Sequence, residues 1–262
     1  MSVLKSARAC LGQVKAYQPG KPLEELEREY GIKNAVKMAS NENALGPSAR
    51  VLRAIRANLG AIHRYPDGGC HALRGRLSRH LGVKPAQLIF GNGSDEVLVF
   101  AVRAFVERSD EVIVADPSFL IYEIASQVEG ARVVKVPAVD FRYDLDAMAR
   151  RITSKTKLIF IANPDNPIGT YVNAGQLKNF LKKVPEHIAV VVDEAYYEFA
   201  RSHKDYPDSL KLLRSFSNLI ITRTFSKVYG MGGLRIGYAI AREPVITVLQ
   251  KVREPFNINS LA

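Results

Sequence analysis

Residues 222–238 read Thr-Arg-Thr-Phe-Ser-Lys-Val-Tyr-Gly-Met-Gly-Gly-Leu-Arg-Ile-Gly-Tyr, and this stretch decides how the rest of the chain is interpreted. Lys227 follows a short polar segment, and a glycine-rich turn over 230–233 leads to Arg235 in a new apolar run. A lysine in a partly apolar pocket can lose its proton and form a Schiff base with a carbonyl. An arginine fork can hold a phosphate at two points. The stretch therefore suits an aldehyde that carries a phosphate, and a surface lysine beside a turn is the alternative.

The chain around this stretch alternates between predicted strands and predicted helices. The pattern predicts strands over 88–90, 111–115, 132–136, 157–162, 188–192, 219–222 and 235–240, and a further short strand that starts at Met38. It predicts helices over 23–30, 49–59, 71–81, 95–108, 119–129, 145–152, 174–183 and 243–252. Strands that alternate with helices of about ten residues indicate crossover connections. We therefore expect an α/β fold with a mostly parallel mixed sheet between helices.

Composition limits the classes of partner and compartment. Lys+Arg 37 against Asp+Glu 26 gives a net charge of +11, but the basic residues are scattered without a run of five like charges. This pattern predicts phosphorylated small molecules rather than nucleic acid as partners. Cys10 and Cys70 form neither a disulfide framework nor a metal pattern, which favours a reducing cytoplasm and no metal. No signal-peptide core or membrane-length apolar run is present, so no membrane partner is expected.

Four polar clusters follow predicted strands, at the edge where open parallel sheets bind their ligands. The first, Gly-Asn-Gly-Ser-Asp-Glu over 91–96, lies between a strand and a helix. Its glycines allow a close approach of the backbone, and the free N–H groups of the helix start attract an anion. The cluster therefore predicts an anion cradle, and an ordinary capped turn is the alternative.

The other three clusters carry groups that suit a flat heteroaromatic ring. Asp193 ends a buried apolar run, where a carboxylate is costly unless it is paired, and a protonated pyridine nitrogen would pair with it. Tyr196 is suited to donate to a phenolate oxygen, and two prolines aim Asn166 from a rigid turn. Phe119 is suited to stack on a ring. A helix-capping aspartate, an Asx turn and a core phenylalanine are the alternatives at these positions.

Taken together with Lys227 and Arg235, these clusters supply a carbonyl-capturing amine, two phosphate contacts, a partner for a ring nitrogen, donors for a ring oxygen and a stacking face. Few cofactors other than pyridoxal 5′-phosphate (PLP) use all of these groups. The residues therefore predict a PLP site.

Several stretches also resemble a known family. They are 17–21 (Tyr-Gln-Pro-Gly-Lys), 40–43 (Ser-Asn-Glu-Asn), 45–47 (Leu-Gly-Pro), 64–66 (Arg-Tyr-Pro), 91–96, 163–170, 192–196 (Val-Asp-Glu-Ala-Tyr), 224–227 (Thr-Phe-Ser-Lys) and 233–238 (Gly-Leu-Arg-Ile-Gly-Tyr). With these stretches the chain resembles the class II, fold-type I PLP-dependent aminotransferases and, among them, the histidinol-phosphate aminotransferases.

This resemblance implies a role for each matching residue. Lys227 would bond to the cofactor and move the proton between the substrate α-carbon and the cofactor. The cofactor would be held by Lys227, Asp193, Tyr196, Asn166, Phe119, Ser94, Asp95, Ser226, Arg235 and Tyr65. Tyr65 would reach the cofactor of the other subunit, which implies a homodimer. Tyr17 and Asn43 would lie near the substrate.

The resemblance also implies a domain division. Residues 1–50 would form an N-terminal arm and part of the small domain, 51–245 the PLP-binding large domain, and 246–262 the start of a helix that leads to a C-terminal small domain. Family members continue for several dozen residues, so the small domain is expected to be incomplete here. Asp165 and Ile168 stand where the family has asparagine and threonine. Both flank Asn166, and we expect them to be tolerated.

The activity implied by the resemblance is a transamination in histidine biosynthesis. It would convert L-histidinol phosphate and 2-oxoglutarate into imidazole-acetol phosphate and L-glutamate. A threonine-phosphate decarboxylase-like reaction or transamination of aromatic amino acids is one alternative. A truncated chain that binds PLP without turnover, or is inactive, is another.

Overall fold

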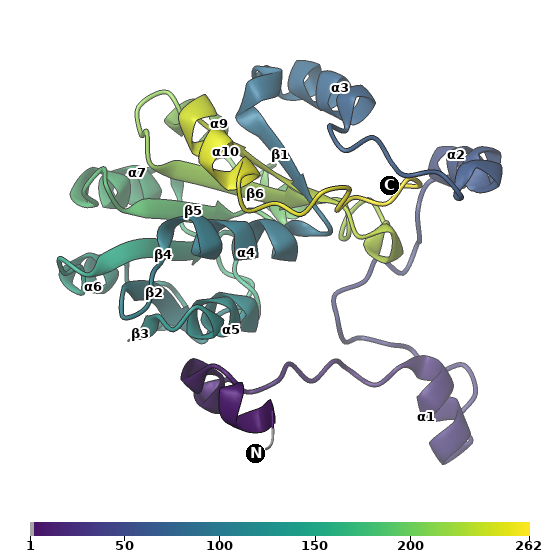
Figure 1. The fold of residues 1–262 in the computed structure, drawn as a ribbon, viewed down its shortest axis with the longest axis horizontal. Helices are drawn as coiled ribbons and strands as arrows, with labels where there is room; N and C mark the ends of the chain where they lie inside the picture. Colours follow the sequence, from purple (N-terminus) through teal and green to yellow (C-terminus); the bar gives the residue numbers. More distant parts are fainter. Residues whose placement is uncertain (1–2) are drawn as a thin grey trace.

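The sheet has the predicted mixed architecture. A computed structural model describes residues 3–262, and within them seven strands form one sheet of order β1-β7-β6-β5-β4-β2-β3. The strands are β1 (Leu88–Gly91), β2 (Glu111–Asp116), β3 (Arg132–Pro137), β4 (Thr156–Ala162), β5 (Ala189–Asp193), β6 (Leu219–Thr224) and β7 (Gly237–Ala241). β7 runs antiparallel to both β1 and β6, and the other pairs are parallel. The predicted α/β fold is confirmed (Figure 1).

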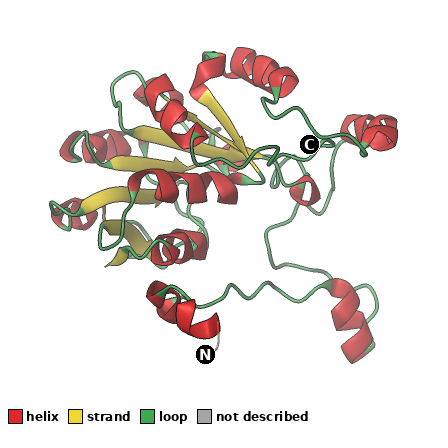
Figure 2. Ribbon diagram, viewed as in Figure 1, coloured by secondary structure: helices red, strands yellow, loops and turns green. Residues whose placement is uncertain are grey.

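Helices cover both faces of this sheet (Figure 2). They are α1 (Leu23–Tyr30), α2 (Ala49–Asn58), α3 (His71–Leu81), α4 (Ser94–Phe105), α5 (Leu120–Val128), α6 (Leu145–Arg150), α7 (Ala174–Lys183), α8 (Tyr197–Ala200), α9 (Ser209–Leu212) and α10 (Glu243–Gln250). Short 3₁₀ helices cover Val3–Ser6, Ala9–Gln13, Leu59–Ala61, Pro85–Gln87 and Gly232–Leu234. None of the helices within residues 3–262 has the length and apolarity needed to cross a bilayer.

The central strands place side chains on alternate faces. Val190 and Val192 of β5 lie in a core with side chains of α6 and α7, whereas Val191 lies in a second core with side chains of α4 and α5. All three valines are fully buried, because each face of the sheet is covered by helices. This coverage on both faces explains why β5 is apolar at successive positions.

The orientation of the strands brings many polar termini to one edge. β2, β4, β5 and β6 are linked by parallel pairs, and β1 shares their direction because β7 runs antiparallel to both β1 and β6. The carboxyl ends of these five strands and the start of β7 therefore lie at the same edge. Loops that carry the predicted site residues leave the sheet there.

The N-terminal arm crosses this edge after an excursion away from the body. α1 projects from the molecule, and residues 31–47 return toward the sheet (Figure 1). The prediction of a short strand from Met38 is wrong, because Met38 is 89% exposed and the segment that follows it forms turns. A segment forms a β-strand only where its backbone pairs with a neighbouring strand, whatever its apolar content.

The C-terminal residues do not continue α10. The helix ends at Gln250, and residues 251–262 form turns rather than the helix that we expected over 246–262. Asn257 donates to the Phe90 carbonyl and Asn259 to the Leu234 carbonyl. These side-chain bonds to distant backbone favour an irregular segment, and Ile258 is buried in the core between them.

Candidate active site

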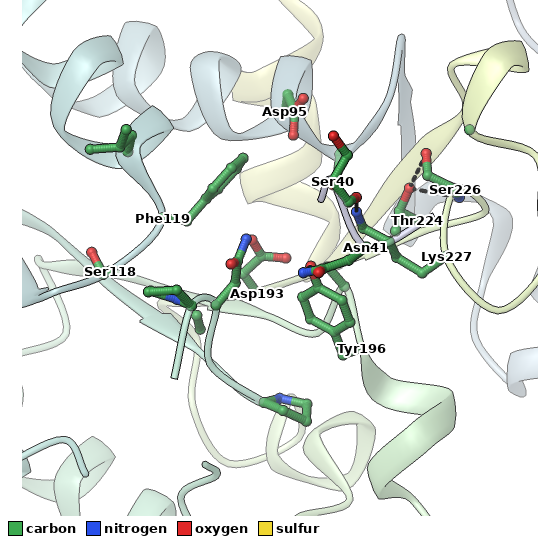
Figure 3. A pocket seen from close by; sticks show the side chains of 18 of the residues that line it. Ser40, Asn41, Asp95, Ser118, Phe119, Asp193, Tyr196, Thr224, Ser226 and Lys227 are labelled. Atoms are coloured by element: carbon green, nitrogen blue, oxygen red, sulfur yellow. Dashed lines mark hydrogen bonds between the residues drawn. The ribbon is translucent and has the colours of Figure 1, made fainter. Parts of the chain in front are cut away.

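A cleft of about 620 Å³ opens at the carboxyl edge of the sheet. All but two of the predicted site residues line it: Tyr17, Ser94, Asp95, Phe119, Asn166, Asp193, Tyr196, Ser226, Lys227 and Arg235. Figure 3 shows the facing arrangement of Phe119, Asp193, Tyr196 and Lys227. Residues that are up to 218 positions apart therefore share one cavity, from Tyr17 to Arg235.

The two remaining predicted residues lie outside the cleft lining. Tyr65 is 83% exposed and stacks on Phe256 with ring centroids 5.0 Å apart. Asn43 donates from Nδ2 to the Val228 carbonyl at 2.8 Å and accepts from the Leu45 N–H at 3.0 Å. Asn43 therefore ties the N-terminal arm to the segment that carries Lys227, rather than facing the cavity.

Lys227 is held over the cleft by the arm. Its Nζ donates to the Ser40 carbonyl at 3.0 Å and lies 5.5 Å from the centre of the Tyr196 ring. Burial lowers the pKa of this amine, and the nearby Asp95 carboxylate works against that shift. An amine with a lowered pKa is unprotonated more of the time near neutral pH, which is the form that attacks a carbonyl.

Asp193 ends β5 with both carboxylate oxygens bonded. The Tyr122 hydroxyl donates to Oδ2 at 2.7 Å, and the Thr222 hydroxyl donates to Oδ1 at 2.8 Å. Burial raises the pKa of Asp193 to about 6, against the opposing effect of these two hydrogen bonds. A carboxylate fixed in this way faces the cleft in one orientation and is suited to bind a cationic ring nitrogen.

An anion cradle lies on the other side of Lys227. The cavity there is lined by the start of α4 at Ser94, by Ser226 and by Arg235. Arg235 donates to the Ser226 hydroxyl and to the Asp95 carboxylate, each at 3.3 Å. Free N–H groups at a helix start, a hydroxyl and a guanidinium together form a set of donors for a phosphate.

Two glycines keep this cradle open. A Cβ on Gly93, which has φ +85°, would lie 2.3 Å from the Arg235 guanidinium. A Cβ on Gly237 would lie 2.2 Å from the Ser94 amide nitrogen. Neither contact is sterically possible, so the close approach of backbone and guanidinium depends on the absence of side chains at both positions.

Asn166 and Tyr196 also line the cleft. The Tyr196 hydroxyl accepts from Asn41 Nδ2 at 2.8 Å, which leaves its own proton free for a ligand. The loop that carries Asn166 is braced by Asp165, which accepts from the Ile168 N–H at 3.0 Å and from the Tyr143 hydroxyl. The aspartate that departs from the family pattern therefore bonds within the protein and not to the cavity.

Sequence reasoning missed Tyr122 and Thr222. Tyr122 lies three residues after Phe119, and thus on the same side of α5. Thr222 pairs with Asp193 in the β5–β6 register. The i, i+3 spacing from Phe119 indicated that Tyr122 lies on the same side of the helix. Nothing in the residue pattern predicted that its hydroxyl would reach Asp193.

A buried ion pair joins the strands beside Asp193. The Arg223 guanidinium donates from Nε and Nη2 to Glu194 Oε2 at 2.8 and 2.7 Å, and it lies 3.5 Å from the centre of the Tyr197 ring. Both side chains of the pair are buried. Burial opposes the charge on Arg223, but the Glu194 carboxylate outweighs it and raises the pKa of the guanidinium. The pair therefore keeps the charge on Arg223 and joins the ends of β5 and β6.

Replacing Arg223 with methionine is expected to lower the free energy of unfolding by about 3–5 kcal/mol, because Glu194 would be left as an unpaired buried charge. Urea denaturation of the cofactor-free protein measures the change. Arg201→Met, at an exposed position, is the matched control and should stay within about 0.5 kcal/mol of the parent. A loss for Arg223→Met as small as that of the control would show that the pair does not hold the two strands.

Comparisons with known proteins agree with this geometry. Residues 33–262 match the family model described as aminotransferase class I and II. The chain is 47% identical over 263 aligned residues to the histidinol-phosphate aminotransferase of Moorella thermoacetica, covering 100% of this chain and 68% of that protein. It is 48% identical over 250 residues to histidinol-phosphate aminotransferase 1 of Idiomarina loihiensis, covering 95% and 68%.

A solved structure shows the same likeness in three dimensions. The histidinol-phosphate aminotransferase of Sinorhizobium meliloti, in complex with pyridoxal-5′-phosphate, superimposes with a TM-score of 0.87 at 34% identity. The match covers 98% of this chain and 68% of that one. The chain thus spans about two thirds of the length of the relatives that it matches.

Proposed function

This chain belongs to the class I and II aminotransferase family, among the histidinol-phosphate aminotransferases, and on that premise we propose that it binds PLP at Lys227 and transfers an amino group from L-histidinol phosphate to 2-oxoglutarate. The products would be imidazole-acetol phosphate and L-glutamate. The observation that carries the proposal is that Lys227, Asp193 and the anion cradle line one cavity.

The residues that line the cavity match the chemical groups of PLP. Gly93 and Gly237 let the start of α4 lie close to Arg235, and the cradle formed there would hold the phosphate. Asp193 would bind the ring nitrogen, since it is buried with both oxygens fixed by protein hydroxyls. Phe119 would cover one face of the ring. These are complementary groups for an acidic phosphate, a basic ring nitrogen and an aromatic surface.

Different side chains of this protein would have different roles in the reaction. PLP, when bound, supplies a ring that stabilises negative charge at the substrate α-carbon. Lys227 Nζ is the amine placed to capture the aldehyde and to carry the proton that leaves the α-carbon. Asn166 and Tyr196 would donate to the ring hydroxyl, and Tyr17 would contact the substrate at the mouth of the cleft. The Ser40 carbonyl accepts from the Lys227 amine, and Asn41 donates to the Tyr196 hydroxyl, so the arm would hold both groups in place.

A homodimer is part of the proposal. Tyr65 is not among the residues that line its own cleft and is 83% exposed, which leaves it accessible to a neighbouring subunit. The arm also exposes large apolar side chains at Val36, Met38 and Leu45. An exposed apolar segment of this kind favours burial against another copy of the chain. A cytoplasmic location is supported by the two free cysteines, Cys10 and Cys70.

The test combines chemistry at Lys227 with substrate choice. The protein is incubated with PLP, reduced with borohydride and digested, and the peptide that contains Lys227 should carry the added mass. L-histidinol phosphate, threonine phosphate and aromatic amino acids are then compared as substrates in parallel. Faster turnover of threonine phosphate or an aromatic amino acid would replace the proposed substrate, and label at another lysine would contradict the site.

Replacing Arg235 with methionine is expected to weaken PLP binding by about 10- to 100-fold, because charge-assisted hydrogen bonds to the phosphate are lost. Spectroscopic titration with PLP measures the affinity. Arg151→Met, at an exposed position beyond α6, removes the same charge away from the cleft and should leave the affinity unchanged. Equal affinities for both variants would show that the cradle does not hold the phosphate.

A further inference from the structure

Tyr122 connects the groups expected on two sides of the cofactor ring. It lies in the first turn of α5 and is 1% exposed. Its hydroxyl donates to Asp193 Oδ2 at 2.7 Å, and its ring meets that of Phe119 edge-on with centroids 5.6 Å apart. One side chain therefore touches both the carboxylate and the stacking residue.

The ring of Tyr122 is itself held in place. It stacks on Phe160 of β4 with centroids 4.5 Å apart and an angle of 7° between the planes. Its backbone N–H donates to the Phe119 carbonyl at 3.1 Å, so the two residues share one turn of chain. A phenol ring fixed by stacking and by backbone cannot move its hydroxyl oxygen away from Asp193 without disturbing the core.

The hydroxyl of Tyr122 can act only as a donor toward an ionised Asp193. Burial and the Asp193 charge raise the pKa of Tyr122 well above its usual range, so the phenol keeps its proton. A donor that favours the charged form of a carboxylate opposes its protonation in a buried site. Without this bond, the carboxylate would hold a proton more readily and would compete with the ring nitrogen for it.

We infer that Tyr122 is a positioning residue that keeps Asp193 ionised and aimed at the cofactor's ring nitrogen while fixing the stacking angle of Phe119. The inference rests on the proposed function only in taking PLP as the group whose nitrogen Asp193 faces. Thr222 donates to the other Asp193 oxygen at 2.8 Å, so both carboxylate oxygens are held by protein hydroxyls.

Other titratable groups lie near Asp193 or Tyr122, and the same residues are present in the parent and in a Tyr122 variant. They are Asp95 on α4, Tyr143 before α6, Asp165 after β4, Tyr196 after β5, Tyr206 before α9 and Lys227 after β6. The Asp95 carboxylate works in the opposite direction to Tyr122, because a like charge raises the pKa of Asp193. A change seen on removing one hydroxyl therefore reports that hydroxyl.

The test follows the Asp193 carboxylate directly by carbon-13 NMR in cofactor-free protein, where burial raises the pKa of Asp193 to about 6. Tyr122→Phe is expected to raise the midpoint by about one pH unit, which is the effect of one charge-assisted hydrogen bond. Tyr206→Phe is the matched control, since its buried hydroxyl donates to the Asn163 carbonyl and not to Asp193. The control should leave the midpoint in place.

A second variant covers the case in which Tyr122→Phe does not fold. Incorporating 3-fluorotyrosine at position 122 keeps the shape and makes the phenol a stronger donor, so the midpoint should fall below that of the parent. In PLP titrations, the pH at which affinity is lost on the acid side should move upward with the phenylalanine variant and downward with the fluorinated one. Midpoints equal to the parent in both would overturn the inference.

Failure of the proposed function and failure of the role inferred for Tyr122 give different experimental results. If the parent does not bond PLP at Lys227, the proposed function is wrong, but the carboxylate titration still decides the role of Tyr122. If the parent bonds PLP and the midpoint ignores Tyr122, the function stands and Tyr122 is a core residue only.

Discussion

Replacing Lys227 with alanine is expected to reduce transamination by at least about 10⁴-fold, because the chain then lacks both the amine that captures the cofactor and the group that carries the α-proton. PLP would still enter the cleft, since the cradle and Asp193 are intact. The visible absorbance of lysine-bound cofactor should be absent, and borohydride should fix no label to the protein.

Lys227→Arg is the matched control for charge. It restores a cation in the cleft but not an amine that deprotonates, so it should be as inactive as the alanine variant. The parent has its own pH signature: since burial lowers the pKa of Lys227, covalent capture of PLP should rise with pH and level off at a lower pH than for free lysine. Covalent capture by either variant would show that another amine does the chemistry.

Replacing Asp193 with asparagine is expected to lower kcat/KM by about 10²–10³-fold while it stabilises the cofactor-free protein. The loss of activity follows because a neutral amide cannot stabilise a protonated ring nitrogen. Alanine at the same position is a less suitable test, because it would also leave the hydroxyls of Tyr122 and Thr222 without an acceptor. Steady-state kinetics and denaturation on the same preparations measure the two effects.

The gain in stability has a defined pH window. The folded pKa of Asp193 is raised to about 6, above the value of about 3.9 for a free aspartate, so folding favours its neutral form. That contribution is complete below about pH 4 and is lost as the pH rises through 6. Above pH 7, burying the charged carboxylate costs about 2–3 kcal/mol, and asparagine removes this cost. A variant that is less stable than the parent at pH 8 would contradict the raised pKa.

The strand-end pattern was sufficient to predict the sheet and most of the cleft. Continuous apolar runs predict buried strands. Asp193 and Phe119 follow such runs at one edge of the sheet. β7 begins at Gly237 rather than at the predicted Arg235, because Arg235 adopts φ +51° and cannot pair in a strand. Such a left-handed residue has no sequence signal when it is not glycine.

The contacts that tune the cleft were not predictable from the sequence. The bond between Tyr122 and Asp193 spans 71 positions and depends on how α5 packs on the sheet. The stacking of Tyr65 on Phe256 likewise depends on how distant segments of the chain pack together. Residue type and spacing indicate which side chains are available, whereas tertiary packing decides which pairs meet.

The arm that covers Lys227 links early and late parts of the chain. Ser40, Asn41 and Asn43 bond to Lys227, Tyr196 and Val228, at sequence separations of 155–187 residues. A ribosome has therefore released residues 40–43 long before their partners exist, and loop-closure entropy delays contacts of such separation. The sheet can therefore assemble before the arm reaches it. We expect newly made protein to bind its cofactor in a cleft that is still uncovered, and the arm to cover Lys227 afterwards.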